Sequence, residues 1–421
     1  MSLARLALRE SLLFPLLKLA LDKMSEDKNR DQLRRDFLMG KIPFALDEST
    51  YHRFSERNTI FSRVGWDTSY QAFRRGISDR EAELVGQKGY SRFGFATSPA
   101  SWMVHDYFLR EFSQEETSLQ PTGFAQVSSN LPRYESGDLN LNSDRVKRLA
   151  QIFGACDVGI VNIDPKQHFI YTHNRKGKQT NLPNEIKHAI VMLIQMDYSA
   201  LMTSPKLPAS ITVGNAYSRA AFAVGCIAEA IRNLGYQAIP SVNSTGPSVP
   251  LAVLAGLGEF GRNGLLIHPK FGQSVRIAKV FTDLPLNADS PINFGAVDFC
   301  RVCGKCAKFC PSQSISDGEP TWESPWNTPS NNNGVYKWYV NADTCYDFWV
   351  RNATDCSNCV RVCPFTKPPG AVHDIVRFFI RNLRFLNRFW VKLDDFLGYG
   401  KSKDPDEFWE SETYLNQEMK R

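Results

Sequence analysis

The sequence predicts an α+β protein with an α/β core, a cysteine-rich module and helical extensions at both ends. Between residues 146 and 290 helical and strand patterns alternate, as in a core where helices cover a sheet. Between residues 300 and 363 lie eight of the ten cysteines, in two regularly spaced runs. The flanking segments are charged and helical. We therefore expect an N-terminal helical covering region (1–145), the core (146–290), the cysteine module (291–370) and a C-terminal extension (371–421).

The N-terminal region carries apolar residues that do not form a convincing membrane span. Charged residues and a proline interrupt Met1–Met24, so no apolar run reaches the length needed to cross a bilayer. No small-residue cleavage site follows, which argues against a secretory signal. Arg34 and Arg35 resemble a twin-arginine export motif, but Met39–Pro43 does not continue as an apolar stretch. These features predict a cytoplasmic location.

The core is predicted from its elements in chain order. A helix is expected over Ser143–Gly154 with Ser143 or Asp144 as its cap, and Arg219–Leu234 is expected to form a helix that ends at Gly235. The other apolar segments are expected to form strands. They are Asp157–Ile163, Glu185–Leu193 (a helix-to-strand candidate), Gln237–Pro240 and Val275–Thr282.

The two cysteine runs have the spacing of bacterial two-cluster ferredoxins. The runs are Cys300-x2-Cys303-x2-Cys306-x3-Cys310-Pro311 and Cys345, then Cys356-x2-Cys359-x3-Cys363-Pro364. In such proteins the fourth cysteine of a run reaches the other cluster. Two 4Fe–4S clusters are therefore expected. The first cysteine group is Cys300, Cys303, Cys306 and Cys363, and the second is Cys310, Cys345, Cys356 and Cys359. Zinc or disulfides are the alternative, but zinc sites rarely repeat this spacing with both prolines.

A glycine-rich stretch precedes the cysteines. In Ala255–Ile267, Gly258, Gly261 and Gly264 allow a close approach of backbone to a bulky group, because glycine has no Cβ. The spacing does not fit a dinucleotide-binding fingerprint.

Read together, these segments resemble one enzyme family. Gly235–Pro240, Ala255–Gly264, Thr282–Leu286 and the two cysteine runs, in that order, resemble the corrinoid-dependent reductive dehalogenases. The resemblance covers about residues 150–400, and epoxyqueuosine reductase shares several of these features. It implies a nitroreductase-like core that holds a cobalamin-type corrinoid base-off beside the nearer cluster. In agreement, the sequence has no Asp-x-His-x-x-Gly motif to supply a histidine to cobalt.

The resemblance also implies particular site residues. Tyr198 matches the proton donor, and Arg262 matches a basic residue that would lower the pKa of this phenol. Tyr171 and Tyr217 are competing candidates for the donor. The positions that match cofactor or substrate contacts are Asn243, Gly258, Gly261, Gly264 and Trp338.

The function that follows is removal of halide from a small organohalide, with electrons relayed through the clusters to cobalt. Halide removal consumes two electrons and one proton, and a separate ferredoxin, flavoprotein or membrane partner would supply the electrons. The alternative is an epoxyqueuosine reductase-like enzyme that modifies tRNA. A net charge of +6 is too weak by itself to indicate nucleic acid, so no nucleic-acid partner is expected.

A basic stripe follows the cysteine module. Its members step by three or four residues, so on one helix they would form a narrow line: Arg377, Arg381, Arg384, Arg388 and Lys392. Apolar and aromatic residues lie between them. Either this amphipathic helix docks on the protein, or residues 375–393 lie on an anionic membrane surface, which would put the protein peripherally on the inner membrane face.

Overall fold

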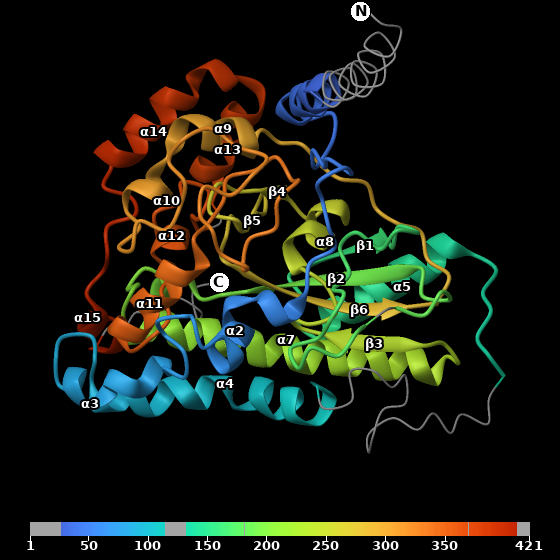
Figure 1. The fold of residues 1–421 in the computed structure, drawn as a ribbon, viewed down its shortest axis with the longest axis horizontal. Coiled ribbons are helices and arrows are strands. Elements are labelled where there is room, and N and C mark those ends of the chain that lie inside the picture. The colour runs from blue at the N-terminus through green and yellow to red at the C-terminus, as the bar shows by residue number, and fades with distance from the viewer. Residues whose placement is uncertain (1–26, 114–131, 181, 369, 411–421) are drawn as a thin grey trace, which may run out of the picture.

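The centre of the fold is a four-stranded antiparallel sheet. The computed structural model describes residues 27–113, 132–180, 182–368 and 370–410 (Figure 1). The strands are β1 (Asp157–Asn162), β2 (His188–Gln195), β6 (Val275–Thr282) and β3 (Ala238–Ser241), hydrogen-bonded in the order β1-β2-β6-β3. Both neighbours of β6 run antiparallel to it.

Helices bury both faces of this sheet. On one face α5 (Leu139–Ile152) and the long α7 (Leu207–Asn233) pack against the strands, and α4 (Arg92–Ser113) runs along α7 in Figure 1. On the other face lies α8 (Ser248–Leu254). Because side chains of β2 point into both layers, its central residues form a continuous apolar run that is fully buried.

The predicted elements of the core are found with shifted ends. Val275–Thr282 is a strand as predicted, and the Glu185–Leu193 candidate is strand β2. The predicted cap of the first core helix is wrong. Asp138 caps α5 by accepting hydrogen bonds from the amides of Asn140 and Leu141, while Ser143 bonds back to a carbonyl inside the helix. The domain limits and the nitroreductase likeness stay predictions.

The cysteine module consists of short helices joined by turns. The cysteines lie in or next to α9 (Ala296–Cys303), α10 (Lys305–Lys308), α11 (Ala342–Asn352) and α12 (Asn358–Arg361). A hairpin of β4 (Glu259–Phe260) and β5 (Leu266–Ile267) lies between this module and α8. The glycine-rich stretch of the sequence forms this hairpin.

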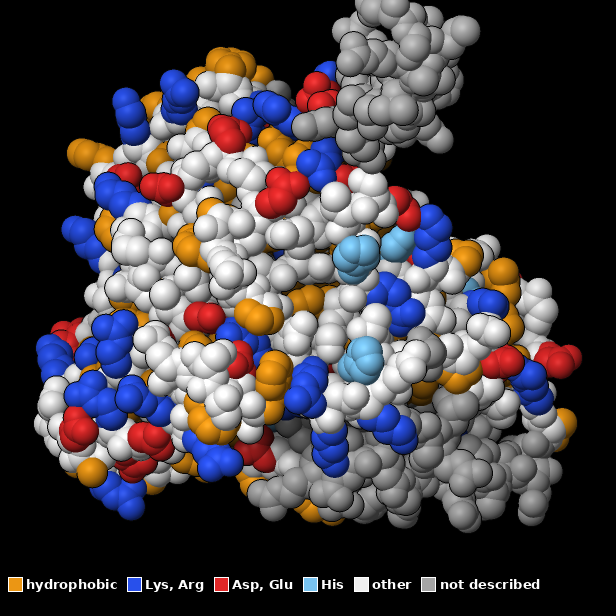
Figure 2. Space-filling view, in the orientation of Figure 1, with side chains coloured by type: hydrophobic (Ala, Val, Ile, Leu, Met, Phe, Trp, Pro, Cys, Tyr) orange, Lys and Arg blue, Asp and Glu red, His pale blue; other side chains and the backbone are white. Residues whose placement is uncertain are grey.

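The basic stripe is not on one continuous helix, so that prediction is wrong. Helix α13 (Ala371–Asn382) ends before Leu383, a 3-10 turn η3 (Arg384–Leu386) follows, and α14 (Asn387–Phe396) is a separate helix. At the break, Arg384 pairs with Asp298 of α9. Figure 2 shows orange and blue side chains together along the edge of the molecule formed by this segment. After it comes α15 (Pro405–Glu410).

No helix in the described ranges combines the length and the apolar character that a membrane crossing requires.

The N-terminal segments cover the cysteine module. Residues 27–38 are helical, and η1 (Glu56–Asn58), α2 (Ile60–Trp66), η2 (Ile77–Arg80) and α3 (Glu81–Leu84) follow. The predicted features of Met1–Met24 lie outside the described residues.

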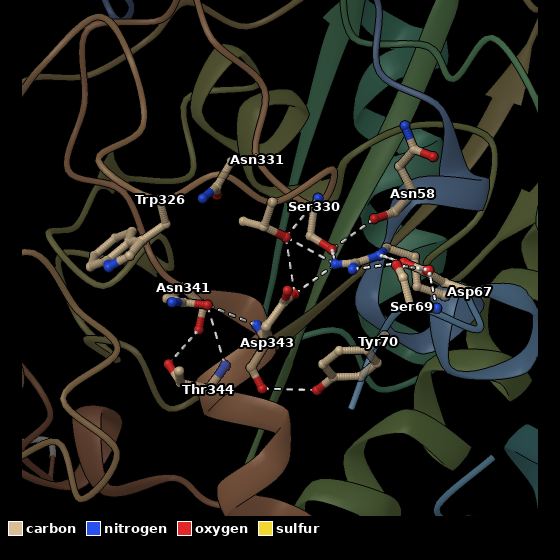
Figure 3. A network of polar contacts seen from close by, with 12 residues as sticks. Asn58, Asp67, Ser69, Tyr70, Trp326, Ser330, Asn331, Asn341, Asp343 and Thr344 are labelled. Carbon is tan, nitrogen blue, oxygen red and sulfur yellow. Dashed lines mark hydrogen bonds and ion pairs between the residues drawn. The ribbon is translucent and has the colours of Figure 1, made fainter. Parts of the chain in front are cut away.

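A buried arginine ties this cover to the module (Figure 3). Arg63 of α2 is 3% exposed and forms ion pairs with Asp67 at 2.8 Å and with Asp343 of α11 at 2.6 Å. Its guanidinium also donates to the hydroxyls of Thr328 and Ser330. One arginine thus holds a covering helix, a loop and the helix that carries Cys345.

Candidate functional site

The first cysteine group lines one cavity. All four members, Cys300, Cys303, Cys306 and Cys363, line it together with the apolar side chains of Ile267, Phe299, Pro364 and Phe365. Four thiols around an enclosed, largely apolar space suit an iron–sulfur cube. The arrangement supports the grouping predicted from the spacing.

The second cysteine group gathers around Cys359 of α12. Charge interactions couple Cys345 to Cys359 and Cys310, and couple Cys356 to Cys359 and Cys345. In the described part of the chain, no three His, Cys, Asp or Glu side chains converge closely enough to hold a single metal ion. A cube is wider than one ion, so its thiolates surround a body instead of meeting at a point.

Both cysteine groups are strongly desolvated. Burial raises the pKa of Cys363 to about 11 and that of Cys345 to about 12. Thiolates in such surroundings require nearby positive charge, which bound iron supplies. The chemistry of the donors and the shape of the cavity therefore both fit iron–sulfur clusters.

Replacing Cys363 by alanine is expected to remove one cluster only. If Cys363 belongs to the first group, the reconstituted variant retains about half of the iron and the spectrum of the second cluster. Iron analysis and EPR of the reduced protein measure this, with Cys226→Ala as the control because Cys226 lies in neither group. An equal loss of iron from the second cluster, to which Cys356 is assigned, would contradict the pairing.

Arg262 supports the first cysteine group. Its guanidinium donates to the carbonyls of Cys300, Ser316 and Gly318 at 2.8–3.2 Å, and its Cζ lies 4.7 Å from the ring centroid of Trp338. Trp338 is 2% exposed and donates to the same Gly318 carbonyl. Both side chains are therefore engaged in holding the module together.

The glycine-rich stretch is closely packed in the hairpin. At Gly264 the φ of +77° lies in the left-handed region that the turn requires, and its amide donates to the Gly261 carbonyl. A Cβ at Gly258 would come within 2.2 Å of the Ile267 carbonyl oxygen. Glu259 does not pair with Arg262, since its carboxylate accepts from the Phe294 and Ala296 amides at the start of α9. Cofactor contact by Gly258, Gly261 and Gly264 stays a prediction.

Tyr198 has surroundings that disfavour its phenolate. It begins α6 (Tyr198–Leu201) and is half-buried. Burial, with the charges of Tyr399 and Asp394, raises the pKa of Tyr198 to about 12. The predicted lowering of this pKa by Arg262 is therefore wrong, because the guanidinium of Arg262 is directed to main-chain carbonyls.

Tyr217, the competing candidate, lies next to an arginine. The Cζ of Arg276, at the start of β6, is 5.1 Å from the centroid of the Tyr217 ring on α7. The ring stacks on Trp102 of α4 with centroids 5.0 Å apart. The Tyr217 hydroxyl has no hydrogen-bond partner among the described residues, and the buried Nε of Arg276 has none either. These two free groups form a site that a ligand can complete.

The Arg276 guanidinium also borders the second cysteine group. Its positive charge acts on Cys359 and on Asp355, the residue before Cys356; burial raises the pKa of both groups and this charge opposes the rise. Sequence reasoning missed Arg276. The alternation of side chains along the predicted strand could have revealed it, because this alternation puts Arg276 on the same face of β6 as Ala278 and Val280, toward α7.

Asn243 lies in a loop that a buried lysine holds. The half-buried Asn243 side chain has no hydrogen-bond partner in the described ranges. Lys279 of β6 is 0% exposed and donates to the carbonyls of Val242 and Gly246 and to the Ser248 hydroxyl at 2.7–3.1 Å. These three bonds fix both ends of the loop, so an Asn243 amide free to bind a ligand would be held in place.

Lys279 is expected to make stability depend on pH. Burial lowers the pKa of Lys279 to about 7, from an ordinary value of 10.5. Between these values the unfolded chain binds more protons than the folded one, so stability rises with pH by at most about 1.4 kcal/mol per unit. Lys279→Met should remove this contribution. Denaturant unfolding of both proteins at pH 7.5 and 9.5 measures it, and equal pH slopes would contradict the assignment.

The core and the cysteine module meet at a close junction before β6. A Cβ at Gly272, where φ is +57°, would lie 2.2 Å from the Phe365 carbonyl oxygen. The Gln273 amide donates to the Thr366 hydroxyl. The turn after Cys363-Pro364 therefore packs directly on the loop that leads to Arg276.

Comparisons with known proteins match the cysteine module and about half of the chain. Residues 299–366 match the family described as 4Fe-4S double cluster binding domain. A tetrachloroethene reductive dehalogenase of Desulfitobacterium hafniense is 45% identical over 227 residues, which are 53% of this chain and 41% of the relative. An epoxyqueuosine reductase of Lactococcus garvieae is 36% identical over 73 residues, which are 17% of this chain and 20% of that protein.

A solved structure matches the fold over most of the described chain. The catabolic reductive dehalogenase NpRdhA superimposes with a TM-score of 0.69 at 23% identity, covering 87% of this chain and 49% of that one. The chain thus spans about half the length of the relatives that it matches.

Proposed function

Because the chain is related to the reductive dehalogenases, we propose that it is an oxidoreductase that removes halide from a small organohalide. The observation that carries the proposal is the juxtaposition of the Tyr217–Arg276 pair with the second cysteine group. It brings a proton donor and an electron carrier to one place. Replacing a carbon–halogen bond by a carbon–hydrogen bond consumes two electrons and one proton, and releases halide.

The two cysteine groups supply the electrons in this proposal. The first group lies beneath α9, α13 and α14, and the second adjoins Arg276. Electrons from an outside donor would enter at the first cluster and leave from the second. The first cluster is therefore the distal one.

A cobalamin-type corrinoid is the proposed cofactor at the reacting centre. It would supply a reduced metal able to take up the organohalide carbon or halogen, and a base-off state fits a sequence without the cobalt-ligating histidine motif. Asn243 and Arg276 fit such a group, because the Asn243 side chain and the buried Arg276 Nε have no hydrogen-bond partner among the described residues. Both lie next to the sheet, at β3 and β6.

Tyr217 is the proposed proton donor. Its hydroxyl is free, and Arg276 holds a positive charge next to the ring, where a phenolate would develop as the proton leaves. Trp102 fixes the ring by stacking. Tyr198 with Arg262 remains the competing assignment from the sequence resemblance, and the variants that separate the two are described in the Discussion.

The alternative, a tRNA-modifying reductase, has narrower support. The match to epoxyqueuosine reductase covers 73 residues, whereas the match to the dehalogenase covers 227.

The proposal is tested by reconstituting the protein anaerobically with iron, sulfide and a corrinoid. Halide release from a panel of haloalkenes and halophenols is then measured with a reduced viologen as the electron source. We expect release that depends on the corrinoid. Turnover of epoxyqueuosine in tRNA, without halide release from any compound, would overturn the proposal.

A further inference from the structure

The face formed by α13, η3 and α14 exposes an unusual number of large apolar side chains. Phe378 is 62% exposed, Phe385 80%, Phe389 54% and Phe396 86%. Val372 and Ile375 are exposed on the same segment. Contiguous apolar side chains of this size on a protein surface mark an interaction site.

Ring contacts join part of this face across α13 and α14. Phe379 of α13 stacks on Trp390 of α14 with centroids 5.8 Å apart. Phe378 contacts Phe379, and Phe389 contacts Trp390. The exposed rings of Phe378 and Phe389 therefore flank a single half-buried stack that joins the two helices.

The charge left on this segment is positive. Its acidic residues are all in ion pairs: Asp374 with Arg377, Asp394 with Lys305 and Lys367, and Asp395 with Lys305. In contrast, Arg381, Arg388 and Lys392 are exposed and form no ion pair with any described residue. On α14, Arg388 and Lys392 alternate with Phe389 and Phe396 along the outward side.

We propose that this face binds the surface of an anionic lipid bilayer. Phenylalanine side chains would enter the boundary between headgroups and acyl chains, while the unpaired cations would contact phosphate groups. The exposed rings project from convex helices and not into a pocket, which suits a bilayer because it adapts to any apolar shape. The inference goes beyond the proposed function and needs no turnover for its test.

The orientation brings the first cysteine group to the membrane side. Ile380, Val376, Trp390 and Val391, on the inner side of these helices, pack in the same cluster as Cys300 and Cys363. A bilayer on the outer side would thus be separated from the first cluster by one layer of helices.

The test is flotation of the reconstituted protein with vesicles of phosphatidylcholine, with and without phosphatidylglycerol. Binding is expected only to the anionic vesicles, and it should weaken at high salt. The variant Arg381→Gln/Arg388→Gln/Lys392→Gln should bind about 100-fold more weakly, at roughly five-fold per cation. The variant Phe385→Ser/Phe396→Ser should bind the anionic vesicles ~10-fold more weakly or worse. Both rings are exposed, so this variant is expected to fold.

A matched control changes three exposed cations of the α/β core: Arg148→Gln/Lys176→Gln/Lys187→Gln removes the same charge elsewhere. It should bind as the parent does. Failure of the parent protein to float with anionic vesicles at low salt overturns the proposal. So does unchanged binding by the Arg381/Arg388/Lys392 variant, which would put the contact in another part of the chain. Capture of an acidic electron-carrier protein by this face, without vesicle binding, also overturns it.

Discussion

Replacing Tyr217 by phenylalanine is expected to lower the rate of halide release by about 10²–10⁴-fold, the usual contribution of a positioned general acid. The substitution removes only the hydroxyl, so the ring keeps its stacking on Trp102 and its contact with Arg276. Iron content and the EPR signals of both clusters should not change. The measurement is steady-state halide release from the reconstituted enzyme, with EPR on the same samples.

Tyr198→Phe is the matched comparison. Burial and nearby negative charge raise the pKa of Tyr198 to about 12, which makes it a poor acid near neutral pH. We expect this variant to keep most of the activity. If Tyr198→Phe is inactive and Tyr217→Phe is active, the donor is the residue that the sequence resemblance first indicated, and the assignment to Tyr217 is wrong.

Replacing Arg63 by methionine is expected to destabilise the protein by about 3–5 kcal/mol, the usual cost of removing one partner from a buried ion pair. The methionine fills part of the volume but leaves Asp67 and Asp343 without their cation. The effect should extend to the second cluster. Asp343 and Thr344 lie in the first turn of α11 and are the two residues before Cys345. Thr344 bonds to Ser314, whose amide donates to the Cys310 sulfur.

Denaturant unfolding measures the stability of the Arg63 variant, and iron analysis measures its second cluster. Arg351→Met is the control, on the helix that carries Asp343, because the Arg351 side chain is exposed and its bond is to a carbonyl of its own helix. It should cost less than about 1 kcal/mol. Equal losses of unfolding free energy in the two variants would show that the buried ion pairs of Arg63 do not stabilise the protein more than an exposed arginine does.

Local sequence signals predicted the parts of the fold that depend on near neighbours. The ferredoxin-like spacing of the two cysteine runs predicted which thiols would share a cluster, and the thiols of the first predicted group line one cavity. The run Val275–Thr282 is a strand as predicted because apolar, β-branched residues crowd it.

The Tyr217–Arg276 pair could not be predicted in the same way. Its members come from a helix and a strand that are far apart in the sequence, and only the packing of α7 on the sheet brings them together. Arg262 matched the basic position of the family motif in the sequence. In the fold, however, its guanidinium is bound by main-chain carbonyls that the sequence does not reveal. The basic stripe failed for a related reason, because the pairing of Arg384 with Asp298 accompanies a break that helical periodicity cannot reveal.

The junction at Gly272 has a consequence for how the enzyme matures. The Cys363-Pro364 turn packs on the loop leading to Arg276, and binding of the proposed iron–sulfur cluster would order that turn. With the proposed cofactors, insertion of the clusters and shaping of a corrinoid pocket would then be thermodynamically coupled, so that each would stabilise the other. Reconstitution should succeed best when iron and sulfide are added before the corrinoid, and a chain starved of iron should take up little corrinoid even when it is abundant.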